Sequence, residues 1–91
     1  MTPEELKRRT KRFALGIIRL AGSLPRTEAA RIIGGQMLRS ATSVGANYRA
    51  ACRARSRAEF TAKLGVVEEE ADETLYWLEL LEESGLVKGQ L

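Results

Sequence analysis

The side chains in this sequence that are best suited to chemistry are its arginines and lysines. Between Arg49 and Arg57, four arginines occur in nine positions, within the segment SVGANYRAACRARSRAEF that spans residues 43–60. Guanidinium and ammonium groups bind phosphate oxygens, which positions a protein on RNA or DNA without reading its sequence. The cations that we predict as phosphate contacts are Lys7, Arg8, Lys11, Arg12, Arg31, Arg39, Arg49, Arg53, Arg55 and Arg57.

Charge is divided unevenly along the chain. Residues 1–57 hold thirteen Lys/Arg and three acids, a net charge of +10, whereas residues 58–91 hold two and nine, a net charge of −7; together they give the overall +3. The division has two interpretations. Either the two halves neutralise each other across helix or subunit contacts, or the basic half faces a polyanion.

Residues for acid–base, metal or redox chemistry are scarce. There is no histidine, which removes the commonest general base and the usual nitrogen ligand of metals. The acidic run at residues 68–73 lacks the Glu-x-x-His pairs of di-iron bundles, so we expect these acids to pair with Lys and Arg instead. No phosphate-binding glycine loop or nucleophile motif is present. We expect no enzyme activity, no metal and no cofactor, and we interpret Cys52 as a small buried hydrophobe.

Composition favours a single all-α domain over residues 1–91. Hydrophobic residues make up 44% of the chain, but it has only one Trp, two Tyr and two Phe, which suits Leu/Ala-rich helices better than a β-sandwich. No apolar run approaches the roughly 20 residues that a membrane helix needs. A single cysteine cannot form an internal disulfide, so nothing indicates an oxidising compartment. Together with the lack of a membrane-length apolar run, this leads us to expect a cytoplasmic protein that does not associate with membranes.

The first helix is predicted over about residues 3–22. Thr2 as N-cap, Pro3 at the first helical position and Glu5 three residues after the cap form a capping box. A proline disfavours the helical conformation of the residue before it, so Pro25 is expected to end this helix. Its apolar face follows spacings of four and three: Leu6, Thr10, Phe13, Ile17, Leu20 and Leu24.

The second helix is predicted over about residues 26–53. Its buried face is expected to hold Ile33, Met37, Ala41, Val44, Tyr48 and Cys52. The glycines of this segment indicate a kink or a very close approach of another helix, and Gly34-Gly35 alternatively marks a loop that divides it. If the helix is continuous, four arginines share an arc of roughly 80° opposite the apolar face: Arg31, Arg39, Arg49 and Arg53.

The third helix is predicted over about residues 57–84, with Ser56 as its N-cap and Gly85 as the residue that stops it. It carries two apolar stripes. The first is Phe60, Leu64, Val67, Ala71, Leu75 and Leu78, and we expect it to pack in the bundle. The second lies nearly opposite and requires another neighbour, so we predict an oligomer interface at Val66, Tyr76, Trp77 and Leu80.

The stretches RSATSVGANYRAACRARSRAEF and VVEEEADETLYWLELLEESG closely resemble a small bacterial four-helix-bundle family. The family includes proteins encoded within intervening sequences of large-subunit ribosomal RNA genes. It is also similar to the accessory variability protein of diversity-generating retroelements, a basic pentameric barrel that works with a reverse transcriptase and nucleic acid. The resemblance implies an antiparallel up-down bundle, assembly as a homopentamer, RNA, DNA or a reverse transcriptase as partners, and no enzyme activity.

Two features depart from the family pattern. The family often has Ile-Pro-Ser-Asn-Ile-Ala-Glu-Gly where this chain has residues 44–51, so Gly45 replaces the proline, Asn47 is kept and Ala50 replaces the acid. The family's fourth helix is also truncated or missing, because the few residues after Gly85 are too short to form one. We therefore expect three long helices, with Trp77 and Leu80 packed between subunits or exposed.

Two functions from different classes fit these features. In the first, the chain is a non-enzymatic homo-oligomer that binds the nucleic-acid backbone through the basic surface of its first two helices. In the second, it is a structural scaffold that binds an acidic protein partner and has no nucleic-acid role. The sequence has few of the aromatic residues on which single-strand readers stack bases, which disfavours base-specific recognition.

Overall fold

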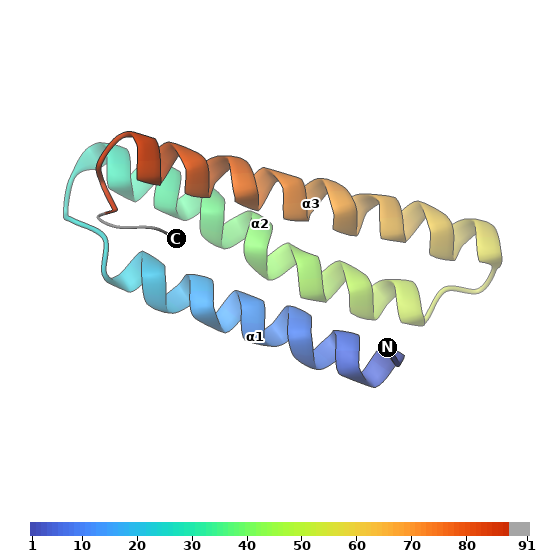
Figure 1. The fold of residues 1–91 in the computed structure, drawn as a ribbon. Helices are drawn as coiled ribbons and strands as arrows, with labels where there is room; N and C mark the ends of the chain where they lie inside the picture. Colours follow the sequence, from blue (N-terminus) through green and yellow to red (C-terminus); the bar gives the residue numbers. More distant parts are fainter. Residues whose placement is uncertain (88–91) are drawn as a thin grey trace.

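The computed structural model describes residues 1–87 and contains three antiparallel helices, α1 (Pro3–Gly22), α2 (Glu28–Cys52) and α3 (Arg57–Glu83). Figure 1 shows α2 lying between α1 and α3 in an elongated molecule of 44 × 20 × 18 Å. Both outer helices pack on α2, and their backbones do not approach each other closely. The prediction of an all-α up-down bundle of three long helices is confirmed.

Each helix begins at a hydroxyl side chain that caps its first turn. The side-chain oxygens of Thr2 and Ser56 accept hydrogen bonds from the third residue of their helices, as predicted. Thr27 does the same for Ala30 at 3.1 Å, so α2 begins at residue 28 and not at 26. At the other end of the chain, Gly85 has a φ of 80°, which is the left-handed conformation expected of the residue that stops a helix.

The glycines of α2 permit close contact with α1 and do not divide the helix. α2 is continuous across Gly34 and Gly35, so the alternative of a loop at that point is wrong. A Cβ atom on Gly34 would lie 2.9 Å from Leu24 Cδ1, and one on Gly45 would lie 3.2 Å from Thr10 Oγ1. Gly45 therefore lies where α1 approaches α2 closely, and Gly34 lies against the turn that follows α1.

The buried core lies where the three helices meet near the α1–α2 turn. Ile17, Met37, Ala41 and Leu81 form its centre, and Met37, Ala41 and Leu81 are fully buried. Leu24, Leu38, Trp77, Leu86 and Val87 are among the partly buried residues that pack around it. The chain after α3 turns towards α1 (Figure 1), which brings Leu86 and Val87 to this core.

The face that α3 turns towards α2 differs from the prediction. Phe60 and Leu75 of the first apolar stripe are 38% and 54% exposed, whereas Thr74 and Leu81, which lie between the two predicted stripes, are fully buried. The face that packs on α2 includes a buried polar contact, since Thr74 Oγ1 lies 2.9 Å from Ser40 Oγ. Hydrophobic periodicity does not report such a contact.

The prediction for Cys52 is also wrong, since this residue is exposed. It is the last residue of α2, where the helix end is left uncovered, and Tyr48 one turn earlier takes the buried position. The region predicted to lack a fourth helix lies partly outside the described residues, since it includes residues 88–91.

Candidate nucleic-acid interface

A small open pocket between α1 and α2 brings together three of the predicted phosphate contacts. Its volume is about 300 Å³. Lys7 and Lys11 come from successive turns of α1, and Arg49 comes from the last turn of α2. The remaining lining residues are small: Thr10, Ala14, Thr42, Gly45 and Ala46. We call this pocket and its rim the α1/α2 groove.

The two hydroxyl groups on the floor of the α1/α2 groove are bonded to their own helices. Thr10 Oγ1 lies 3.0 Å from the Leu6 carbonyl oxygen, and Thr42 Oγ1 lies 2.7 Å from the Leu38 carbonyl oxygen. Each hydroxyl proton is therefore used within its helix. An anion in the groove would be bound by the three cations of the rim and not by donors on the floor.

The cations of the α1/α2 groove have little negative charge to compensate them. None of the residues that line the groove is acidic. Lys7 has one acidic neighbour, with its Nζ atom 3.6 Å from Glu4 Oε1, but the Glu4 side chain is 71% exposed and such a pair contributes little in water. The groove therefore presents a local excess of positive charge.

A second, larger pocket of about 640 Å³ lies between the same two helices near the α1–α2 turn. Arg26 and Arg31 are the cations among its lining residues, and Leu24, Leu38 and Gly34 provide apolar surface. Arg31 and Arg49 are five helical turns apart, which puts them on the same side of α2 about 27 Å apart. Arg26 was not among the predicted phosphate contacts; it was expected at the start of the second helix, whereas the structure places it in the turn before α2.

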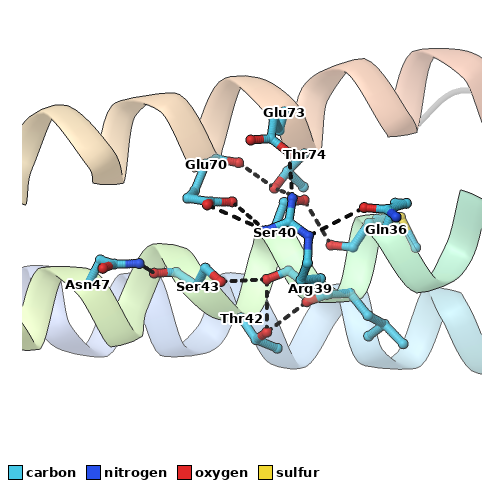
Figure 2. A network of polar contacts seen from close by, with 11 residues as sticks. Gln36, Arg39, Ser40, Thr42, Ser43, Asn47, Glu70, Glu73 and Thr74 are labelled. Carbon is cyan, nitrogen blue, oxygen red and sulfur yellow. Dashed lines mark hydrogen bonds and ion pairs between the residues drawn. The ribbon is translucent and has the colours of Figure 1, made fainter.

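Arg39 was predicted as a phosphate contact, but the structure pairs it with α3. Its Nη1 atom lies 3.3 Å from Glu70 Oε2, and its Nη2 atom contacts Glu73 Oε1 (Figure 2). Its Nε atom also donates to Gln36 Oε1 at 3.3 Å. With two carboxylates beside it, Arg39 is compensated, and we do not include it in the basic surface.

The other predicted residues do not gather at one site. Five of the predicted cations are exposed and line neither pocket: Arg8, Arg12, Arg53, Arg55 and Arg57. Of the predicted interface residues, Val66 is 38% and Tyr76 is 54% exposed, and Leu80 is half-buried. Trp77 packs against the core of its own chain, with its indole nitrogen buried and without a hydrogen-bond partner among the described residues.

One titratable group near the outer end of α2 has a shifted pKa. Burial raises the pKa of Tyr48, and its hydrogen bond to Cys52 and the nearby charges of Cys52 and Glu4 act in the same direction. The described residues include no group of three or more His, Cys, Asp or Glu placed to hold a metal ion. Over that same part of the chain, no helix is long and apolar enough to cross a membrane.

Comparisons with known proteins give a consistent assignment. The family model described as 23S rRNA-intervening sequence protein matches residues 4–90. Among solved structures, the chain is similar to a protein of unknown function from the S23 ribosomal protein family of Bacteroides thetaiotaomicron VPI-5482, with 40% sequence identity and a TM-score of 0.88 over 97% of this chain and 79% of that chain. None of the curated proteins matches it. The extent of the family match shows that the chain belongs to the 23S rRNA-intervening sequence protein family.

Proposed function

We propose that this protein is a non-enzymatic cytoplasmic homo-oligomer that binds the phosphate backbone of RNA or DNA through the α1/α2 groove. The observation that carries the proposal is the convergence of Lys7, Lys11 and Arg49 around a groove without acidic lining residues. The family name associates its members with 23S ribosomal RNA, which supports a nucleic-acid ligand.

The α1/α2 groove is suited to binding the phosphate backbone of a nucleic acid and not to recognising its bases. Its rim offers charge without the fixed pairs of donors and acceptors that read base edges. Arg31 and Arg26 continue the same side of the molecule towards the α1–α2 turn, so a strand that runs along the groove would meet cations at both ends. Binding by such contacts is independent of sequence and depends strongly on salt.

Self-association is the second part of the proposal. The structure leaves large apolar side chains exposed on every helix, among them Ile18, Ile32 and Leu75, and exposed apolar surface is a common feature of protein–protein contacts where it is contiguous. The resemblance to the pentameric accessory protein makes five copies the expected number. In that assembly several α1/α2 grooves would act on one polyanion, which would raise the overall affinity.

The proposal is tested by titrating labelled RNA and DNA duplexes of two unrelated sequences with the protein and following fluorescence anisotropy at low and at moderate salt. We expect binding at low salt that weakens steeply as salt is added, with similar affinity for duplexes of unrelated sequence. An absence of binding at low salt would show that the groove does not bind nucleic acid.

An acidic protein partner is the competing explanation for the same surface. Adding an unlabelled polyglutamate peptide to the duplex complex separates the two. A backbone-binding groove should prefer the duplex at equal total charge, because phosphates at regular spacing match several cations at once. Stronger binding of the peptide than of either duplex would favour the scaffold function.

A further inference from the structure

The larger pocket between α1 and α2, at the α1–α2 turn, has an apolar wall that phosphate binding does not need. Its volume is about 640 Å³, against about 300 Å³ for the α1/α2 groove. Pockets that hold small organic groups typically enclose roughly 300–1,000 Å³. The wall includes the half-buried side chains of Leu24 and Leu38 and the bare backbone of Gly34 and Gly35. We call this the turn pocket, and a phosphate group alone would leave its apolar wall uncovered.

Two arginines line the turn pocket and are available to an anion. Arg26 and Arg31 are exposed, and neither forms an ion pair within residues 1–87. Glu28 is the one acid among the lining residues, so the net charge of the lining is positive. A ligand that matches both the wall and the charge has a flat apolar part and an anionic part. A nucleotide has both, in its base and its phosphate, and unstacked bases also stack on guanidinium planes.

The turn pocket and the α1/α2 groove lie end to end along one side of α2. The residues that α2 contributes to this side recur at alternating spacings of four and three: Arg31, Gly35, Leu38, Thr42, Gly45 and Arg49. The distance from Arg31 to Arg49 along the helix is about 27 Å. That length corresponds to about eight nucleotides of a duplex strand, at roughly 3.4 Å each. A strand held by Arg49 therefore reaches the turn pocket about eight nucleotides further along.

We infer that the turn pocket binds an unpaired nucleotide that extends from a duplex held in the α1/α2 groove. A base inside a duplex is covered by its stacked neighbours, whereas an unpaired base can leave the stack and lie against the apolar wall. Arg26 and Arg31 bind the phosphate of that nucleotide. Because every base has an apolar face, the pocket selects unpaired ends without selecting a sequence. The inference rests on the proposed function and narrows its ligand to a duplex with a single-stranded extension.

Three ligands built on one RNA duplex test the inference by anisotropy. One is blunt, one carries a short single-stranded extension, and one carries an extension of the same length without bases, so both extensions have the same number of phosphates. The extensions are placed at the 5′ ends in one series and at the 3′ ends in another. In one series at least, the extension with bases should bind about tenfold more tightly than the extension without them. Equal affinities in both series would overturn the inference, while binding of the blunt duplex would leave the proposed function standing.

Gly35 and Gly16 provide matched variants for locating the base. Both are exposed, and nothing lies within 4 Å of either Cβ position, but only Gly35 lines the turn pocket. Gly35→Leu should lose the preference for bases and keep its affinity for the blunt duplex within about twofold, because the cations are untouched. Gly16→Leu should keep both. Circular dichroism checks that both variants remain helical. A preference for bases that survives in Gly35→Leu would overturn the assignment to this pocket.

The double variant Arg26→Gln/Arg31→Gln tests the phosphate contact. It should weaken binding of the extended duplex more than binding of the blunt one, and should lower the salt slope of the extended duplex by about two. The control is Arg53→Gln/Arg55→Gln, at exposed arginines that line neither pocket. It should weaken both duplexes by the same factor. If the Arg26/Arg31 variant also weakens both equally, these arginines do not bind the extension and the inference fails.

Discussion

The two sides of α2 use the same kind of side chain differently. On the α3 side, Arg39 is held by Glu70 and Glu73, next to the buried Ser40–Thr74 hydrogen bond (Figure 2). On the α1 side, Arg49 shares a groove with Lys7 and Lys11, and no acid lines it. Arginines that belong to one exposed arc of α2 thus stabilise the fold on one side and remain available for a ligand on the other.

The difference has its origin in the charge of the neighbouring helices. α3 brings carboxylates to α2, whereas α1 brings lysines. Arg39 is a weak candidate for binding an anion, because Glu70 and Glu73 already compensate its charge. Three cations around one groove repel each other, which costs folding stability and is relieved when an anion binds. For this reason the proposed nucleic-acid-binding surface is on the α1 side.

The largest effect on stability is expected from separating α1 from α2. A leucine at Gly45 would press on Thr10, whose Oγ1 lies 3.2 Å from the position of a Cβ atom, so Gly45→Leu should lower the free energy of unfolding by about 1–3 kcal/mol. Gly35→Leu is the matched control, because nothing lies within 4 Å of its Cβ position. Urea denaturation should show a loss for Gly45→Leu only; equal losses would mean that the close approach is not what matters.

A smaller effect is expected on the α3 side. Arg39→Met leaves Glu70, whose side chain is only 16% exposed, without its cation, and should cost about 1 kcal/mol of unfolding free energy after allowance for solvent screening. The affinity for duplex should stay within about twofold, since the charge lost was compensated. Arg53→Met, at an exposed arginine, is the stability control. A large loss of duplex affinity in Arg39→Met would break the distinction between the two sides.

The smallest expected effect concerns pH. Burial raises the pKa of Tyr48 above its ordinary value of 10.0, so the folded state favours the neutral phenol. The stability this provides is fully present below about pH 10 and is lost as pH rises through the raised pKa. Unfolding free energies measured from pH 9 to 11 should fall less steeply in Tyr48→Phe than in the wild type. The exposed Tyr76→Phe should not change the slope, and an equal change in both variants would argue against a buried phenol.

Much of the fold could be predicted because it is encoded locally. Thr2 and Ser56 mark helix starts because their side-chain oxygens accept hydrogen bonds from the first turn, and Gly85 marks a helix end through its positive φ. The buried face of α2 follows from the spacing of Met37 and Tyr48 with their apolar neighbours. The rotation of α3 could not be predicted in this way. The side of α3 that faces α2 includes the contact of Thr74 with Ser40, a hydroxyl pair between distant parts of the chain that hydrophobic periodicity does not report.

The candidate site could be predicted only as a set of charges. Lys7, Lys11 and Arg49 were chosen on the same grounds as Arg39, since all are cations on amphipathic helices. The axial register of α1 and α3 against α2 decides which cations lie next to one another and which lie next to a carboxylate. The sequence pattern contains no information on that register. Arg26 lies in the turn just before α2, and its place beside Arg31 depends on the path of that turn.

The central claim is that the α1/α2 groove, and not positive charge in general, binds nucleic acid. Two triple variants with equal loss of charge test it in one duplex titration at low salt: Lys7→Gln/Lys11→Gln/Arg49→Gln at the groove, and Arg8→Gln/Arg53→Gln/Arg55→Gln at exposed cations outside it. We expect the groove variant to lose roughly 100-fold in affinity and to reduce the salt slope by about three, with a loss of less than about tenfold in the control. Equal losses in the two variants would contradict the claim.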